Sequence, residues 1–317
     1  MQQAGNCVKR LLATGMHGFV GRALARVVST DAKLHHVRLV DVPPDLDLRN
    51  PADATTMAGA EPPDAVIHLA AQSFVPEAFR DPKATFEVNV VGTLNLLQAL
   101  RAVGFAGRMV YVGTGDVYGR VDEATLPVAE TAVPEPRNPY AVSKLAAEAL
   151  CRQWAFTEQM DVMLARPFNH IGWGQSDRFV VSDFARQIVA IKYGRRPPVV
   201  EIGDIDVTRD FTDVEDVVHA YFALLERGVP GATYNVCSGR DRSIRSILER
   251  LADLAGVTVS TAPADVRMRK AEQRRMCGDP SAIHRATGWR ATTALDDSLR
   301  AMLRYWENED HACPNLH

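Results

Sequence analysis

The residues best suited to chemistry are a tyrosine and a lysine one helical turn apart, in the stretch Tyr140-Ala141-Val142-Ser143-Lys144. Positions i and i+4 lie on the same face of a helix, so the two side chains point into the same space. An isolated tyrosine, with a pKa near ~10, is a poor acid–base catalyst at neutral pH. A neighbouring ammonium group favours the phenolate and lowers that pKa. We therefore expect Tyr140 to exchange a proton with a substrate and Lys144 to lower the pKa of Tyr140.

A hydroxyl and a carboxylate follow the apolar run at residues 109–112. Thr114 can donate a second hydrogen bond to the same substrate oxygen, and Asp116 could act as an acid or a base. A Tyr-x-x-x-Lys pattern alone arises by chance in many helices, whereas its combination with a threonine at a strand end and a glycine-rich turn is specific. The candidate catalytic residues are Thr114, Tyr140, Lys144 and Asp116.

The glycine-rich turn joins the first apolar run to the first expected helix, in the stretch Thr14-Gly15-Met16-His17-Gly18-Phe19-Val20-Gly21. Glycines let the backbone turn sharply and approach a pyrophosphate, and the helix N-terminus offers free N–H donors. The spacing is G-x-x-G-x-x-G rather than G-x-G-x-x-G, but a strand before it and a helix after it favour a dinucleotide site. The candidate cofactor-binding residues here are Gly15, His17, Gly18, Phe19, Val20 and Gly21.

Acidic residues after the second apolar run bear on the choice of cofactor. Asp41 can accept hydrogen bonds from the adenosine ribose hydroxyls, and its charge would repel a 2′-phosphate. The alternative is a turn residue at the end of a strand. Asp47 and Leu48 could contact the adenine, although Asp47 could equally lie in a solvated turn. The expected cofactor is NAD(H) or NADP(H), with NAD(H) favoured.

These groups must be positioned by alternating strands and helices. Apolar runs predict strands at residues 8–13, 37–40, 65–70, 108–112, 161–165 and 233–236, and helical periodicity predicts helices at 19–28, 83–103, 140–157, 180–193, 213–226, 243–255 and 294–306. The alternation through residue 165 is typical of an α/β fold with a doubly wound, Rossmann-type parallel sheet. We expect residues 1–167 to bind the dinucleotide, with returning segments near 200–240, and residues 168–317 to form a smaller, interleaved substrate-binding region.

Composition excludes several other classes of protein. The chain has 317 residues, 46% hydrophobic and 24% charged, with a formal net charge of -3, so neither a nucleic-acid nor a metal site is expected. Its five cysteines have no paired spacing, and the odd number argues against a disulfide framework. No signal peptide or membrane span is expected, since Gly15 and Gly18 break the first apolar run. A cytoplasmic protein without membrane contact is therefore expected.

Four motifs together resemble the extended short-chain dehydrogenases/reductases that act on nucleotide-sugars: Thr14 to Gly21, His68-Leu69-Ala70-Ala71, Thr114 with Val117-Tyr118-Gly119, and Tyr140 to Lys144. The resemblance covers nearly the whole chain. It implies that Thr114, Tyr140 and Lys144 form a catalytic triad, and that Lys144 also holds the nicotinamide ribose. It further implies cofactor contacts at Leu69, Ala70, Ala71 and Pro167, and substrate contacts at Gln72, Ser73 and Thr114.

The second half of the chain resembles the GDP-mannose 4,6-dehydratase branch of that family and its reductase relatives. The matching stretches are Ala165 to Gly172, Asp206 to Phe211 and Arg269 to Gln273, with Lys270 where the dehydratases usually have proline. The resemblance implies that side chains of these stretches hold GDP and its sugar, and arginine suits a diphosphate on physical grounds. The candidate substrate-binding residues in this half are Asn169, Arg178, Val180, Arg195, Arg209, Arg269 and Glu272.

For two residues in this half, a structural role stands as an alternative to the functional one. His170, next to Asn169, is better interpreted as a satisfied polar residue than as a catalyst. Arg195 precedes Arg196, Pro197 and Pro198 and could lie in a solvated turn; only if it faces the substrate would it meet a phosphate.

The residues after Thr114 bear on the type of reaction. The family's dehydratases place a glutamate three residues before the glycine of the Val-Tyr-Gly motif, and many carry an aspartate just before it; here these positions are Asp116 and Gly115. The shorter carboxylate reaches about 1.5 Å less, which is enough to spoil proton abstraction. The resemblance therefore implies NAD(P)H-dependent reduction of the C4 keto group of GDP-4-dehydro-6-deoxy-D-mannose to GDP-6-deoxy-D-mannose.

Three alternatives remain open at this point. A 4,6-dehydratase with Asp116 as its base would keep NAD tightly bound, and a 4-epimerase would use the same three residues without net oxidation or reduction. A redox-sensing scaffold would bind the dinucleotide without turnover, and it would not need an intact Thr114, Tyr140 and Lys144. The long helices that begin near Lys83 and Tyr140 resemble those that pair family members, which implies a homodimer through a four-helix interface.

Overall fold

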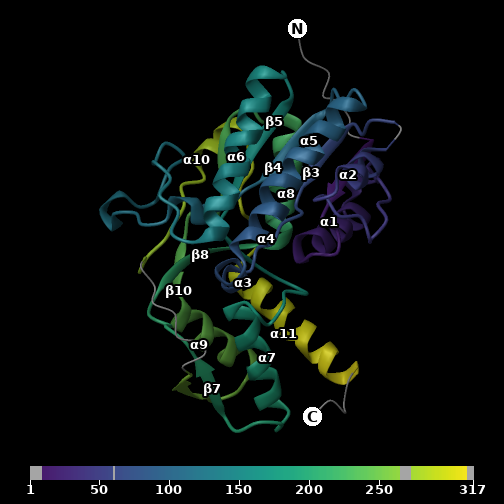
Figure 1. Ribbon diagram of the computed structural model, residues 1–317. Coiled ribbons are helices and arrows are strands. Elements are labelled where there is room, and N and C mark those ends of the chain that lie inside the picture. Colours follow the sequence, from purple (N-terminus) through teal and green to yellow (C-terminus); the bar gives the residue numbers. More distant parts are fainter. Residues whose placement is uncertain (1–8, 60, 265–272, 313–317) are drawn as a thin grey trace.

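A parallel six-stranded sheet forms the centre of the computed structural model, which describes residues 9–59, 61–264 and 273–312 (Figure 1). The strand order is β2-β1-β3-β4-β5-β9, and every pairing is parallel. The strands are β1 (Arg10–Thr14), β2 (Arg38–Leu39), β3 (Ala65–His68), β4 (Arg108–Val112), β5 (Asp161–Pro167) and β9 (Thr233–Val236). The predicted doubly wound α/β fold is confirmed. From β1 the chain goes to β2 on one side and then to β3 on the other, and ligands bind at the carboxyl edge beside such a switch point.

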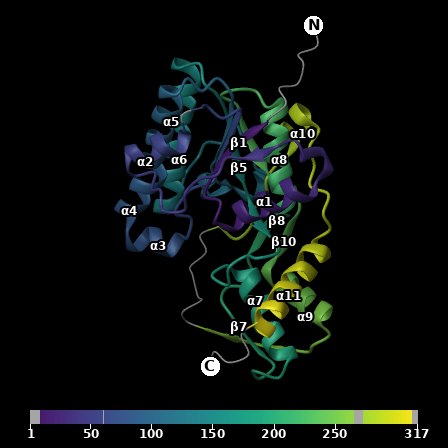
Figure 2. The ribbon, with the colours of Figure 1, turned by 90° about the vertical axis from the view of Figure 1, so that its right-hand side faces the viewer.

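Helices cover both faces of this sheet (Figure 2). One face packs against α1 (Phe19–Thr30), α8 (Val214–Arg227) and α10 (Ser281–Thr287). The other packs against α2 (Pro51–Ala58), α5 (Gly92–Ala102) and α6 (Pro139–Thr157). Because side chains alternate along a strand, Leu11 and Ala13 enter the first cluster and Leu12 the second. This burial on both faces explains why the strands read as continuous apolar runs.

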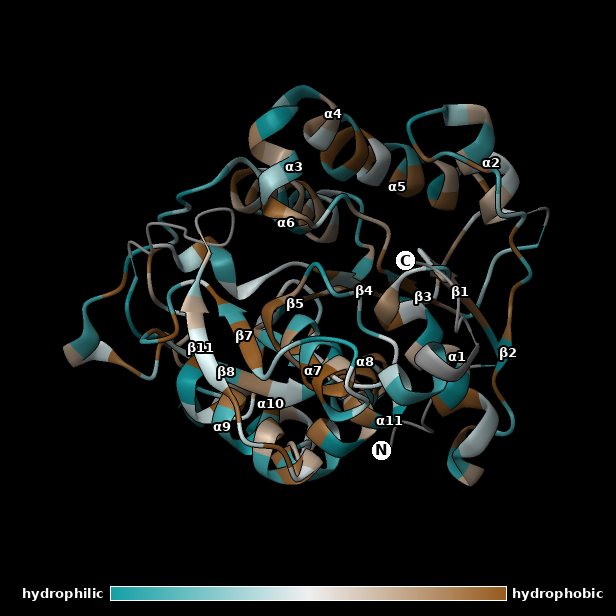
Figure 3. Cartoon of the chain, turned by 90° about the horizontal axis from the view of Figure 1, so that it is seen from below, coloured by the Kyte–Doolittle hydropathy of each residue, from teal (hydrophilic) through white to brown (hydrophobic). Residues whose placement is uncertain are grey.

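The segment predicted as one helix at residues 83–103 consists of three pieces. They are α4 (Pro82–Phe86), a π-helical turn (Glu87–Val91) and α5, and the short helix α3 (Val75–Arg80) precedes them. Seen from below (Figure 3), α3, α4, α5 and α6 lie together along one side, across from the second core. Single 3-10 turns lie at Ala32–Leu34, Gly115–Tyr118 and Glu123–Thr125.

A second, smaller core lies below the sheet in the view of Figure 1. Its helices are α7 (Val180–Lys192), α9 (Ile244–Ala255) and α11 (Leu295–Ala312). Its strands form the sheets β10-β8-β6 and β11-β7, from β6 (Asn169–Ile171), β7 (Val199–Ile202), β8 (Thr208–Asp213), β10 (Asp241–Ser243) and β11 (Ser260–Pro263). The sequence did not predict these strands, because several of them, such as β8 and β10, are rich in polar residues and lack the apolar run that marks a strand of the main sheet.

The chain passes repeatedly between the two cores. It leaves β5 for β6 and α7, returns to the sheet with α8 and β9, enters the second core again at α9, returns with α10, and ends in α11. The division into residues 1–167 and 168–317 stays a prediction. Within the described ranges, none of the helices combines the length and apolar character that a membrane span needs.

Candidate active site

Two glycines of the turn between β1 and α1 have no room for a side chain. Gly15 has a φ of 73°, and a Cβ there would lie 2.8 Å from the backbone N of Ala70. A Cβ on Gly21 would lie 2.5 Å from the carbonyl oxygen of Gly15. Gly18 is the N-cap of α1 and offers no side-chain cap, so the first N–H groups of the helix remain available to an anion. The turn therefore fits a pyrophosphate.

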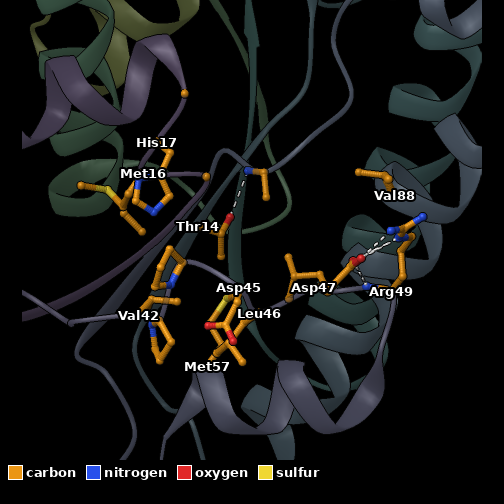
Figure 4. A pocket seen from close by; sticks show the side chains of 17 residues that line it. Thr14, Met16, His17, Val42, Asp45, Leu46, Asp47, Arg49, Met57 and Val88 are labelled. Carbon is orange, nitrogen blue, oxygen red and sulfur yellow. Dashed lines mark hydrogen bonds and ion pairs between the residues drawn. The ribbon is translucent and has the colours of Figure 1, made fainter.

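A pocket of about 380 Å³ opens between this turn and the segment after β2 (Figure 4). Predicted cofactor-binding residues on its wall are Gly15, His17, Gly18, Asp47, Leu48 and Ala70. The pocket is also lined by Met16, residues 42–46, Met57 and Val88, which were not predicted as cofactor-binding. Apolar walls of this kind suit a flat base such as adenine. The apolar, proline-containing stretch 42–46 directly after a strand was the available signal.

The predicted acidic residues have different surroundings. Arg49 Nη2 lies 2.5 Å from Asp47 Oδ2, and the Arg49 backbone N–H donates to Asp47 at 2.9 Å. Hydrogen bonds from Arg49 hold the pKa of Asp47 below its usual value. Asp41 is exposed and is not among the residues that line the pocket, although its neighbour Val42 is. Its part in cofactor choice stays a prediction.

The remaining predicted cofactor residues lie beside the pocket rather than on its wall. Phe19, Val20 and Gly21 form the first turn of α1, and Leu69 and Ala71 flank Ala70 after β3. Pro167 is the last residue of β5.

A buried chain of hydrogen bonds ties the turn to β3 and α5. Thr14 Oγ1 accepts from the backbone N–H of Ala70 at 3.0 Å and lies 2.7 Å from His68 Nδ1. His68 Nε2 lies 2.9 Å from Thr93 Oγ1. Burial, with a smaller contribution from the charge of Lys144, lowers the pKa of His68 to about 3. The imidazole is therefore neutral and serves as a connector.

The predicted catalytic residues meet at the carboxyl end of β4. Asn138 is the N-cap of α6 and accepts from the Ala141 backbone N–H at 2.8 Å, which places Tyr140 in the first turn. Thr114 and Tyr140 are hydrogen-bonded through their side chains. Lys144 Nζ lies 4.8 Å from the centre of the Tyr111 ring. The structure therefore brings the predicted triad together.

Burial sets the protonation of this triad. It raises the pKa of Tyr140, with a smaller contribution from the charge of Asp116, while the hydrogen bond to Thr114 lowers it. It also lowers the pKa of Lys144 to about 8. The expected lowering of the Tyr140 pKa by Lys144 is not found: burial of the phenol is the largest cause, and the lowering comes from Thr114 rather than from Lys144. Tyr140 is a neutral phenol, which is the form that can give a proton away.

Lys144 is buried, and within the described part of the chain no carboxylate pairs with its ammonium group. A buried ammonium needs hydrogen-bond acceptors. The hydroxyl groups of a nicotinamide ribose would supply them, so this side chain fits the role that the resemblance implies.

Asp116 and Gly115 follow Thr114 on a 3-10 turn. The Asp116 side chain is open to solvent, although surrounding protein raises its pKa and the charge of Arg209 lowers it. A Cβ on Gly115 would lie 3.0 Å from the ring of Phe168. The ring therefore fills the space that an acidic side chain at position 115 would need.

Most of the predicted substrate residues lie near one another. Gln72 accepts from the backbone N–H of Phe74 at 2.6 Å, Ser73 lies between them, and the Arg178 guanidinium lies 5.6 Å from the Phe74 ring. Asn169 on β6 is paired with Phe211 on β8, the strand that carries Arg209. The charges of Arg209 and Asp116 interact, which links this set to the triad.

Four predicted substrate residues are not part of this set. Val180 is the first residue of α7 and is exposed. Arg195 follows the far end of α7, roughly 20 Å along the helix from Val180 at its start, and its guanidinium lies 5.5 Å from the Tyr193 ring. Arg269 and Glu272 lie outside the described residues.

The sequence analysis missed Asn89, which lies in the π-helical turn and is buried. Its amide accepts from the Gln72 backbone N–H at 2.8 Å, and donates to the Gln72 carbonyl oxygen at 3.0 Å and to Ser143 Oγ at 2.9 Å. It thereby connects the predicted substrate residue Gln72 to the helix of Tyr140 and Lys144. A buried asparagine inside an apolar helical pattern was the only signal, and π-turns concentrate at functional sites.

Comparison with known proteins agrees with this geometry. The family model described as GDP-mannose 4,6 dehydratase matches residues 44–302. A GDP-6-deoxy-D-mannose reductase of Pseudomonas aeruginosa is 52% identical over 300 residues, covering 95% of this chain and 98% of the relative. A dTDP-glucose 4,6-dehydratase of Neisseria gonorrhoeae is 27% identical over 344 residues, covering 96% and 97%.

A solved structure, described as RMD from Pseudomonas aeruginosa complexed with NADPH, superposes with a TM-score of 0.91. It is 51% identical and covers 95% of this chain and 99% of its own. The family predicted from the motifs is confirmed. The chain belongs to the GDP-mannose 4,6-dehydratase family of extended short-chain dehydrogenases/reductases.

Proposed function

We propose that this chain reduces the C4 keto group of GDP-4-dehydro-6-deoxy-D-mannose, with NAD(P)H as the reductant, to give GDP-6-deoxy-D-mannose. The observation that carries the proposal is an assembled Thr114, Tyr140 and Lys144 beside a glycine at position 115, whose side-chain space the Phe168 ring fills. The family's dehydratases have a glutamate at position 116, and many have an aspartate at position 115. Here these positions hold the shorter Asp116 and a glycine. The name of the 52% identical relative supports the reductase over the dehydratase alternative.

Each residue of the triad has a separate task. The reduced nicotinamide, when bound, supplies the hydride that is added to C4. Tyr140, a neutral phenol, donates a proton to the carbonyl oxygen, and Thr114 donates a hydrogen bond that polarises the same oxygen. Lys144 holds the ribose hydroxyls and stabilises the phenolate left after proton transfer, until Tyr140 takes up a proton from solvent.

The substrate side is proposed from residues on β6, β8, the segment before α7 and the segment after β3. Arg209 is fixed by donating to the carbonyl oxygens of Thr208 at 2.8 Å and Gln273 at 3.1 Å, which suits a residue that must hold a diphosphate. Arg178 and Asn169 would contact the nucleotide-sugar from the same side, with Gln72 and Ser73 opposite. Arg195, Val180, Arg269 and Glu272 remain candidates on the strength of the resemblance.

Cofactor choice rests on two opposing observations. The carboxylate of Asp41 favours NAD(H), whereas the solved relative with a TM-score of 0.91 is described with NADPH. Titrating the protein with NADH and NADPH separately decides between them. Tighter binding of NADPH would show that Asp41 does not exclude a 2′-phosphate.

The decisive experiment compares two substrates. With GDP-mannose alone, we expect no consumption of the sugar. With GDP-4-dehydro-6-deoxy-D-mannose and NADH or NADPH, we expect oxidation of the dinucleotide in step with formation of a GDP-linked 6-deoxyhexose. Consumption of GDP-mannose alone would instead establish the dehydratase, and interconversion of C4 epimers without net oxidation would establish the epimerase.

We also propose a cytoplasmic homodimer that pairs through the helices on the α3–α6 side. Large apolar side chains are exposed on neighbouring elements there: Phe79, Phe86, Val91 and Val142. A cluster of this kind on one side of a monomer is typical of a protein interface.

A further inference from the structure

Arg22, in the first turns of α1, joins two loops that are far apart in the sequence. Its Nη1 donates to the carbonyl oxygen of His17 at 2.6 Å, and its Nη2 donates to the carbonyl oxygen of Gly174 at 2.9 Å. His17 belongs to the glycine-rich turn of the dinucleotide site. Gly174 belongs to the segment 172–179, here called the substrate loop, which leads from β6 to α7. One side chain therefore connects the cofactor side to the substrate side.

The substrate loop has an unusual backbone. Gly172 and Gly174 have φ values of 151° and 83°, a backbone shape that most residues avoid. The near end of the loop packs against α11, where Trp173 contacts Tyr305 with ring centres 5.4 Å apart. Its far end carries Arg178, which lies over Phe74 of the opposite side. Between these ends, Arg22 connects the loop to the glycine-rich turn by a hydrogen bond.

A second contact runs parallel to the first. Phe19, in the first turn of α1, stacks on His170 of β6 with ring centres 5.9 Å apart and planes 5° from parallel. His170 Nδ1 lies 3.0 Å from the carbonyl oxygen of Phe168, and Gln175 of the substrate loop donates to the His170 carbonyl oxygen at 2.8 Å. The turn and the loop are therefore joined by two separate sets of contacts.

We propose that Arg22 is a positioning residue that couples dinucleotide binding to the shape of the substrate loop. When the pyrophosphate fixes the glycine-rich turn, the His17 carbonyl holds the guanidinium, which in turn holds Gly174 and presents Arg178 to the nucleotide-sugar. By linkage, the nucleotide-sugar strengthens dinucleotide binding by the same factor. The identity of the loop's ligand rests on the proposed function; the coupling between turn and loop does not.

The first test measures the loop without turnover. Amide hydrogen exchange of peptides covering residues 173–179 is followed with and without NADPH in wild type, Arg22→Met and Arg26→Met. Arg26 is the matched control, because its Nε donates to Glu215 at 2.7 Å on α8, within the same core. We expect NADPH to slow exchange about fivefold in wild type and in Arg26→Met, and clearly less in Arg22→Met, where the stacking of Phe19 on His170 still joins turn and loop. Equal protection in Arg22→Met, or no protection in wild type, overturns the proposal.

The second test separates positioning from folding. Arg22→Met is expected to raise the KM for the keto-sugar about fivefold with kcat near wild type, and Arg22→Lys, which keeps one of the two hydrogen bonds, to fall between them. A loss confined to NADPH affinity, with the KM for the sugar unchanged, overturns the proposal. Because the exchange test needs no reaction, its failure in an active reductase refutes the coupling alone, and its success in a protein that reduces no keto-sugar refutes the proposed function alone.

Discussion

The proton that completes a reduction has to come from a side chain that still carries it at neutral pH. Burial raises the pKa of Tyr140, so the phenol is protonated when a substrate arrives. Replacing Tyr140 by Phe removes that proton while leaving the ring, so we expect turnover to fall by about 100-fold or more. Binding of NADPH, measured by fluorescence titration, should stay near wild type. Tyr305→Phe, on α11, is the control; substantial turnover in Tyr140→Phe would refute the assigned role.

His68 gives a prediction about acid stability. In the unfolded chain it takes up a proton below its ordinary pKa of 6.5, whereas the folded side chain stays neutral down to about 3. The unfolded state therefore binds more protons between these values, and the free energy of unfolding falls as the pH falls through this window. The fall is up to about 1.4 kcal/mol per pH unit.

His68→Gln should remove this contribution to the pH dependence, at the cost of lower stability at pH 7. Urea unfolding between pH 7 and pH 5 measures it, with the exposed His36→Gln as the control. An unchanged pH dependence in His68→Gln would mean that other groups control acid stability.

For individual residues, the sequence predicted those whose pattern is local and missed those whose partners are distant along the chain. Tyr140 and Lys144 form a local pattern, and Thr114 and the glycine-rich turn each follow a recognisable strand. The contact of Phe168 with the Gly115 position, and the hydrogen bond from Arg22 to Gly174, join residues that no local spacing relates. Such contacts depend on the packing of the whole chain.

Among the elements, α6 and β5 are held together by an ion pair inside the protein. Arg166 Nε donates to Glu148 Oε2 at 2.8 Å and Nη2 to Oε1 at 2.7 Å, with both side chains buried. Glu148 also pairs with Arg152, whose Nη2 lies 3.1 Å from Oε1, so its carboxylate keeps one partner when Arg166 is removed. Removing Glu148 instead leaves the buried Arg166 guanidinium without its carboxylate, so we expect Glu148→Leu to lower the free energy of unfolding by about 3–5 kcal/mol.

A double-mutant cycle tests this. Glu148→Leu combined with Arg166→Met should cost less than the sum of the single changes, because the second change removes the stranded guanidinium. The exposed pair Arg137–Glu135 is the control and should contribute about 1 kcal/mol or less. Additive losses in the buried pair would contradict this account.

Element prediction succeeded where an apolar run or a helical period marked the element. The six strands of the main sheet and the long helices were predicted, with boundaries shifted by a few residues. The π-helical turn at Glu87–Val91 was not, because local spacing does not mark it, and its Asn89 contacts Gln72 and Ser143, which are distant along the chain.

For the whole molecule, the apolar side chains on the α3–α6 side predict an oligomeric state. The side chains of Phe86 and Val91 are 36% and 43% exposed, and the proposed dimer would bury them. Phe86→Glu combined with Val91→Glu places two charges at this interface. We expect sedimentation to change from dimer to monomer at micromolar concentration. Val229→Glu, a charge on a side chain that is 57% exposed elsewhere, is the control and should leave the dimer intact. A wild type that sediments as a monomer would refute the interface.

The passage of the chain back and forth between its two cores bears on how such a protein can acquire a new substrate over generations. A segment exchanged with a relative at a single point between residue 167 and α10 would carry parts of both cores: α8, β9 and α10 of the large one or α7, α9 and α11 of the small one. The smaller core therefore cannot be exchanged whole at one such point without part of the larger core. We expect specificity in this lineage to change mainly through single residues, in loops such as 172–179 and at strand ends, while the framework that positions them is kept whole.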